Sequence, residues 1–180
     1  MSSFKDRIIR AAKLDAHLYE EVEADTEAMG QAVGVVVLSS VAAGVGVIAR
    51  GGLGGIVPVL LLGTIFALIQ WFVWAYLTYF IGTKLLPEAQ TRADFGQLLR
   101  TIGFASSPGL IRVLGVIPGL TWIVFLIANI WMLIAMVIAV RQALDYESTL
   151  RASGVCLIGW IIQLLILALL FSILGAPQSF

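Results

Sequence analysis

Long runs of apolar residues, separated by short polar stretches, dominate the pattern of this chain. Residues 28–49, 56–83 and 152–174 contain no charged side chain, and residues 101–140 contain only Arg112. The apolar positions are continuous instead of alternating, which is typical of helices and not of barrel strands. Because a helix needs about 20 mostly apolar residues to cross a bilayer, each run is long enough to span a membrane.

Proline and glycine residues divide these runs into five predicted transmembrane helices. The run 101–140 exceeds the length of one span, and Pro118 with Gly119 makes a tight turn in its middle. A glycine-rich turn at 50–55 separates the first two spans. The fold class that we expect is therefore all-α and polytopic, with a membrane domain over residues 29–180. Its spans are predicted at about 31–49, 56–81, 104–117, 120–140 and 152–174.

The positions of lysine and arginine predict the orientation, because these residues favour cytoplasmic segments. With five spans and a cytoplasmic N-terminus, Arg50 falls outside, Arg112 lies within the third span, and the other basic residues are cytoplasmic. If residues 101–118 only re-entered the membrane, Arg141 and Arg151 would move outside. We therefore expect five spans, with the N-terminus in the cytoplasm and the C-terminus outside.

Residues 1–28 form a charged segment that precedes the first span. Its basic residues come first and its acidic residues follow, so the basic half suits an anionic membrane surface and the acidic half suits water or a basic partner. The alternative is a solvated helix that only tethers the first span. Helical spacing, broken at Asp15, predicts a cytoplasmic amphipathic helix. Its apolar positions are Phe4, Ile8, Ala11, Leu18 and Val22.

Composition supports a membrane protein and excludes other classes. Hydrophobic residues make up 60% of the 180 residues and charged residues 12%, against about 45–50% and about 25% in soluble proteins. A soluble domain of this size lacks the interior to bury so much apolar surface. A single cysteine, Cys156, cannot form an intrachain disulfide. These values exclude a soluble globule, a disordered chain and a disulfide scaffold.

The sequence offers little support for catalysis or for a metal site. Its one histidine, His17, lies in the charged N-terminal segment, where we expect a surface residue. No predicted span contains Asp or Glu, and no zinc-binding or phosphate-binding motif is present. The sequence Gly44 to Ala49 matches a dinucleotide-binding pattern, but in an apolar helix its small residues indicate close helix packing. We therefore expect a protein that is not an enzyme and that binds no metal or cofactor.

Four polar residues within the predicted spans are candidate intramembrane positions: Gln70, Arg112, Asn129 and Gln163. A charge at membrane depth costs about 2.5–3.5 kcal/mol on insertion scales. For Arg112 we favour snorkelling to a lipid phosphate, while pairing with an acidic residue near the cytoplasmic face requires a shallow third span. The other three side chains are expected to hydrogen-bond between helices, and the alternative is a polar path.

One part of the chain combines several distinctive motifs. They are the stretch Asp94 to Pro108, which ends in G-F-A-S-S-P, then Ile117-Pro118-Gly119, then Ile130-Trp131, then Val140 to Asp145. Their order resembles the Yip family of multi-pass membrane proteins, and the resemblance covers roughly residues 95–160. In physical terms, Pro108 suits the first turn of a helix and Ser106 or Ser107 can cap it. Arg100 is expected at the level of the lipid headgroups, and Arg141 at the cytoplasmic end of the fourth span.

The resemblance implies five spans, a cytoplasmic N-terminus and a short outside tail. In eukaryotes it implies work in membrane traffic, with Rab GTPases as partners. This chain has a short charged segment where that pattern has a long proline-, glutamine- or aromatic-rich N-terminus. We therefore expect a small bacterial-type member in the cytoplasmic (inner) membrane, with a Rab-type GTPase as partner only if the protein is eukaryotic.

Three functional hypotheses follow. The first is a non-enzymatic scaffold that organises the membrane or partner proteins, in a trafficking-like role. The second is a small transporter or channel that uses Gln70, Arg112, Asn129 and Gln163 as a polar path. The third is an accessory subunit of a larger membrane complex. Expected partners are the bilayer and a membrane protein or a second copy, and no nucleic acid. The expected structural or interaction residues are Arg100, Ser106, Ser107, Pro108, Arg141 and Asp145.

Overall fold

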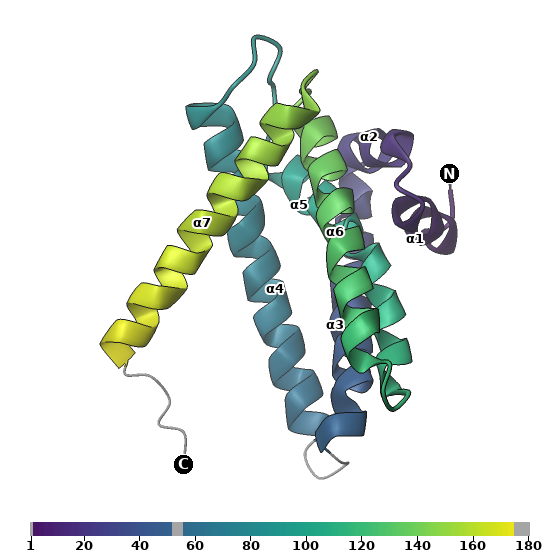
Figure 1. The fold of residues 1–180 in the computed structure, drawn as a ribbon. Coiled ribbons are helices and arrows are strands. Elements are labelled where there is room, and N and C mark those ends of the chain that lie inside the picture. The colour runs from purple at the N-terminus through teal and green to yellow at the C-terminus, as the bar shows by residue number, and fades with distance from the viewer. Residues whose placement is uncertain (1, 52–55, 175–180) are drawn as a thin grey trace.

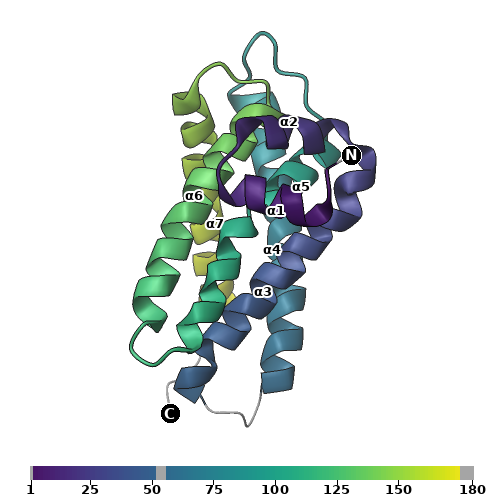
Figure 2. The same cartoon turned by 90° about the vertical axis from the view of Figure 1, so that its right-hand side faces the viewer.

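The computed structural model describes residues 2–51 and 56–174, and the regular structure within these ranges is entirely helical. The long helices α3 (Met29–Gly51), α4 (Ile56–Phe80), α6 (Thr121–Ala143) and α7 (Thr149–Leu174) run lengthwise through the molecule (Figures 1 and 2). The all-α prediction is confirmed. Residues 52–55 of the predicted glycine-rich turn and the tail 175–180 lie outside the described residues.

Four helices in the described ranges are long and apolar enough to cross a membrane. They coincide with the first, second, fourth and fifth predicted spans. The second is extended by a π-helical turn, η2 (Ile81–Leu85), which continues directly from α4. The four candidate spans are Thr26–Val47, Val57–Leu85, Thr121–Ala143 and Thr149–Ile166.

The third predicted span, 104–117, has a different structure from the one expected. The chain forms α5 (Phe95–Phe104), breaks at Ala105 and Ser106, and continues as a 3₁₀ helix, η3 (Ser107–Val116). A 3₁₀ helix rises about 2.0 Å per residue, so these 10 residues extend about 20 Å, against about 30 Å for a hydrocarbon core. This segment is absent from the candidate spans of the described residues.

The 3₁₀ helix nevertheless leads the chain to the far end of the bundle. It packs between α3 and α6, and its end lies beside the end of α3 (Figure 2). Glycine makes this approach feasible, because a Cβ built on Gly46 would lie 2.1 Å from the backbone oxygen of Arg112. The predicted close helix packing at Gly46 is thus confirmed. The predicted turn follows, with Gly119 at φ +85° and Leu120 N donating to Ile117 O at 3.1 Å.

The N-terminal segment is a folded cap instead of one helix. It comprises α1 (Phe4–Ala12), α2 (Ala16–Ala24) and the short 3₁₀ helix η1 (Thr26–Ala28), and we call these elements the N-terminal cap. The chain reverses at Leu14, which has φ +63°, and the Asp15 side chain accepts from His17 N at 3.0 Å to start α2. The prediction of one helix over this segment is therefore wrong. Two helices form instead, because Asp15 favours the start of a new helix.

The apolar face of the N-terminal cap packs on the bundle. Leu18, Tyr19 and Val22 are completely buried, in one cluster with Phe104 of α5 and Ala135 of α6. The helical periodicity of this segment thus reflects packing on the protein's own helices. A second core cluster joins α4, α5, α6 and α7. Outside both cores, α4, α6 and α7 expose large apolar side chains, as expected for surfaces that face lipid.

Candidate functional site

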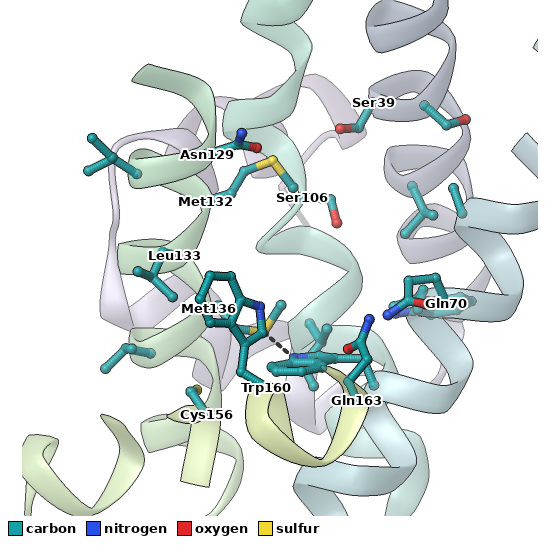
Figure 3. A pocket seen from close by; sticks show the side chains of 18 of the residues that line it. Ser39, Gln70, Ser106, Asn129, Met132, Leu133, Met136, Cys156, Trp160 and Gln163 are labelled. Atoms are coloured by element: carbon teal, nitrogen blue, oxygen red, sulfur yellow. Dashed lines mark hydrogen bonds between the residues drawn. The ribbon is translucent and has the colours of Figure 1, made fainter. Parts of the chain in front are cut away.

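A cavity of about 960 Å³ lies inside the bundle, among α3, α4, η3, α6 and α7 (Figure 3). Its wall is mainly apolar and includes Trp71, Trp74, Met136 and Trp160. Its volume is within the range of about 300–1,000 Å³ that is usual for ligand sites. Trp160 and Met136 were not among the residues expected from the sequence, because apolar residues in a span carry no signal that separates a cavity wall from a lipid-facing surface.

The cavity opens sideways between α6 and α7. Ile130 and Leu133 of α6 and Leu157 and Trp160 of α7 line it and are also exposed at the molecular surface. Figure 1 shows why, since α7 diverges from α6 towards its C-terminal end. Both helices are long and apolar enough to cross a membrane, so the exposed apolar side chains at this opening suit contact with lipid.

The structure brings the four candidate intramembrane residues together around this one cavity. Gln70 comes from α4, Arg112 from η3, Asn129 from α6 and Gln163 from α7. In Figure 3 the side chains of Gln70 and Gln163 point toward one another from their two helices. The sequence indicated each residue separately, but their convergence depends on the packing of four elements.

Arg112 makes one polar side-chain contact in the cavity. Its Nη2 donates to Asn129 Oδ1 at 2.6 Å, and its guanidinium carbon lies 5.7 Å from the centre of the Phe125 ring. Its Nε is buried and has no hydrogen-bond partner among the described residues. None of the ion pairs in the described ranges includes Arg112. The considered pairing with an acidic residue of the cap end is therefore not found.

Two indole N–H groups fix part of the cavity wall. Trp74 Nε1 donates to Met136 Sδ at 3.2 Å, and Trp71 Nε1 donates to the backbone oxygen of Leu99 at 3.1 Å. These contacts join α4 to α6 and to α5. Both rings keep a polar partner while presenting apolar area to the cavity, which is the usual compromise for buried tryptophan.

Arg100 lies inside the protein, between α5 and the N-terminal cap. Its side chain is buried, and its Nε donates to Val22 O at 2.9 Å. Its Nη2 donates to the backbone oxygen of Glu23. These carbonyls belong to the last turn of α2, where backbone oxygens lack helical partners. Arg100 therefore connects α5 to the N-terminal cap.

The serines of the G-F-A-S-S-P motif do not cap the following helix. Ser106 makes no capping hydrogen bond and lines the cavity instead. Ser107 is buried, and its hydroxyl has no partner among the described residues. Pro108 is buried in the first turn of η3, which agrees with the expected position of proline.

Arg141 and Asp145 shape the connection between α6 and α7. Arg141 Nε donates to Tyr146 O at 3.2 Å, and Asp145 has a left-handed φ of +52°. The Tyr146 hydroxyl donates to Gly82 O and Leu86 O at 2.9 and 2.7 Å, which ties this connection to the end of η2. In this structure the Arg141 side chain contacts the connection itself, and the backbone N of Asp145 donates to Gln142 O at 2.9 Å.

Two arginines of the N-terminal cap form ion pairs with acidic residues of the same segment. Arg7 pairs with Glu21 and Asp25 at 3.0 and 2.7 Å, and Arg10 pairs with Asp15 and Glu21 at 2.8 and 2.6 Å. A hydrogen bond from Ser2, with the two arginines, lowers the pKa of Glu21 to about 2. The reversal at Leu14 thus places the basic half of the segment against its acidic half. This pairing involves Arg7 and Arg10, while Lys5 and Lys13 of the basic half belong to none of the ion pairs of the described residues.

Comparison with known proteins agrees with the motif order in the sequence. A family model described as the Yip1 domain matches residues 18–171, from α2 of the N-terminal cap to the last turns of α7. No curated protein and no solved structure matches the chain. Because the family match covers most of the chain and includes the whole cavity, the protein belongs to the Yip family of multi-pass membrane proteins.

Proposed function

We propose that this protein is a non-enzymatic scaffold of the membrane, which holds a protein partner on its N-terminal cap. The observation that carries the proposal is the attachment of the cap to the bundle. Besides the Arg100 contacts, Trp131 Nε1 donates to Ala12 O at 2.8 Å and Gln142 Nε2 donates to Glu20 Oε1 at 2.7 Å. A cap held by α5 and α6 presents a constant surface, which lowers the ordering cost of binding a partner.

The exposed side of α1 is the surface that we assign to the partner. This side exposes Lys5, Ile9 and, just after the helix, Lys13. The two lysines belong to none of the ion pairs among the described residues. Two unpaired lysines beside an apolar side chain suit an acidic partner surface with an apolar centre. An accessory subunit of a larger complex would use the same surface.

A partner test follows from this surface. The protein is purified from native membranes in mild detergent or nanodiscs, and co-migrating proteins are identified by mass spectrometry. We expect one partner at fixed stoichiometry, lost in the double variant Lys5→Glu/Lys13→Glu and retained in the control His17→Ala, whose side chain is also exposed. A wild-type protein that migrates alone contradicts the scaffold.

The scaffold is proposed to have five spans, with the cap in the cytoplasm and the C-terminus outside, in the bacterial cytoplasmic membrane. Two observations support this topology. The chain runs from the cap end to the opposite end through α5 and η3 (Figure 1), and Lys84, Arg92, Arg141 and Arg151 belong to the segments at the cap end. A reporter fused at Phe180 is expected to be active only outside, whereas one inserted after Gln90 is expected to be active only inside. Cytoplasmic activity at Phe180 would exclude five spans.

A small transporter is the second candidate, favoured by the convergence of Gln70, Arg112, Asn129 and Gln163 around one cavity. A polar path requires that these groups contact the transported species. Vesicle flux measured with wild type and Arg112→Ala tests this function, because equal flux in both excludes a path through Arg112. The absence of carboxylates from the described cavity lining makes a cation an unsuitable cargo.

A further inference from the structure

Arg112 is a cation for which the described part of the chain supplies no counter-charge. Its one side-chain hydrogen bond goes to the neutral amide of Asn129, at 2.6 Å. Its buried Nε has no partner in the described ranges. A guanidinium carries five N–H donors, and a buried charge is costly unless it is paired. This arrangement leaves donors of Arg112 available to an anion.

Arg112 contacts α6 away from the ends of that helix, at the exposed side chain of Asn129. Asn129 is eight residues into α6, whose first residue is Thr121, and this corresponds to about 12 Å along the helix. The contact with Asn129 therefore places the guanidinium well inside the span. An anion that reaches it from the bilayer must arrive attached to an apolar group.

The remaining polar lining of the cavity also favours an anion. Because Asn129 Oδ1 accepts from Arg112, the amide N–H₂ group of Asn129 remains as a donor. Gln70 and Gln163 lie on the side of the cavity away from Asn129 (Figure 3), and among the described lining residues there is no Asp or Glu. A site with one uncompensated cation, an amide donor and no carboxylate complements a phosphate or a carboxylate.

The apolar part of the cavity has the properties of a binding surface for an acyl chain. Leu133 and Met136 of α6 lie beside Trp160 of α7 in the cavity wall (Figure 3). An occupant from the bilayer can enter between these helices without crossing a polar layer. An unbranched chain fits such a wall, since Met and Trp side chains adapt to flexible apolar ligands.

We propose that this cavity binds one anionic phospholipid, with its phosphate on Arg112 and Asn129 and an acyl chain against Trp160, Leu133 and Met136. A bound phosphate would supply the counter-charge that Arg112 lacks among the described residues, and an acyl chain would cover the apolar wall. This site lies inside the membrane domain and does not depend on the partner surface of α1. Its failure would leave the scaffold proposal intact, and the reverse also holds.

Tryptophan quenching by brominated lipids tests the proposal in the intact protein. The protein is placed in phosphatidylcholine vesicles that contain an increasing fraction of phosphatidylglycerol with brominated chains. A parallel series uses brominated phosphatidylcholine. We expect half-maximal quenching at an about tenfold lower fraction of the anionic lipid, because tenfold corresponds to about 1.4 kcal/mol, near the contribution of a hydrogen bond to a charged group. Equal quenching by both lipids in wild type overturns the proposal.

Variants assign the selectivity to the cavity. Arg112→Gln is expected to remove the tenfold preference, whereas Lys84→Gln, which removes an exposed cation from η2 at the cap end, is expected to keep it. Asn129→Leu provides a second variant if Arg112→Gln does not fold, and we expect at least a threefold loss of preference. Trp160→Phe should remove most of the selective component of the quenching. Full preference in folded Arg112→Gln overturns the assignment to Arg112.

A competition experiment separates a lipid from a soluble anion. Inorganic phosphate is added to the vesicles at constant ionic strength, at concentrations up to about 10 mM. We expect no change in the quenching by brominated phosphatidylglycerol, because the chain contacts contribute to lipid binding only. Loss of the preference on addition of phosphate would assign Arg112 to a soluble anion and overturn the lipid proposal.

Discussion

Arg100 on α5 donates to the backbone oxygen of Val22 at the end of α2, across 78 residues of sequence. A second donor of the same guanidinium reaches the oxygen of Glu23. One buried side chain therefore satisfies two carbonyls that α2 leaves without helical partners. This contact makes the N-terminal cap part of the membrane domain, and it underlies the proposal that the cap presents a fixed surface.

Replacement of Arg100 by methionine is expected to release the cap. The variant keeps much of the apolar stem but leaves the carbonyls of Val22 and Glu23 without their charged donor, which costs about 1.5–3 kcal/mol for each hydrogen bond. Hydrogen exchange of α1 and α2 in detergent should accelerate at least tenfold, while exchange in α6 stays unchanged. Arg151→Met, at an exposed arginine, is the matched control. Unchanged exchange in the cap would contradict this role of Arg100.

Gly46→Ala is expected to disturb the contact between α3 and η3. A Cβ at this position would lie 2.1 Å from the backbone oxygen of Arg112 and 3.0 Å from the Phe125 ring. A backbone oxygen cannot move aside as a side chain can, so α3 and η3 must separate to admit the new methyl group. Overpacking of this kind costs about 1–3 kcal/mol. The thermal midpoint in detergent should fall. Gly63→Ala is the control, since nothing lies within 4 Å of its Cβ and alanine favours a helix. Equal midpoints for both variants would show that the close approach is not needed.

The stability of the cap is expected to fall in acid because of Glu21. Hydrogen bonds from Ser2, Arg10 and Arg7 lower its pKa from 4.5 to about 2. A lowered pKa stabilises the folded state fully above pH 4.5, and this contribution is lost as the pH falls from 4.5 towards 2. The protection of the cap amides, relative to their intrinsic exchange rate at each pH, should fall over this window in wild type. Glu21→Gln should be destabilised at neutral pH and should show less pH dependence, whereas Glu27→Gln should behave as wild type.

Glu23 is expected to produce the opposite pH dependence. Burial, together with the charge of Asp145, raises its pKa from 4.5 to about 7, while Arg100 opposes this shift and Glu20 and Asp94 add to it. Between pH 4.5 and 7 the unfolded cap loses this proton and the folded cap keeps it, so stability falls as the pH rises through this window. Glu23→Gln should remove this loss and slow cap exchange at pH 8. Faster exchange in Glu23→Gln would contradict the raised pKa.

The lengths of the apolar runs are sufficient to predict most of the architecture. A run without charges is stable in lipid only as a helix, because each backbone group then finds a partner within its own segment. Local chemistry also determined the turn at Pro118 and Gly119. Asp15 starts α2 by a local contact of the same kind, but the helical periodicity on both sides of it led us to predict one helix.

Tertiary contacts decided the path of the segment after Pro108, the ion pairs of the N-terminal cap and the composition of the cavity wall. The segment after Pro108 is a narrow 3₁₀ helix whose position depends on Gly46 of another helix. The charges of the N-terminal segment pair with each other because the chain reverses at Leu14. The sequence by itself predicted Gln70, Arg112, Asn129 and Gln163 as intramembrane positions. Only the packing of four separate elements decided that they surround one cavity, because periodicity along one helix contains no information about the register of its neighbours.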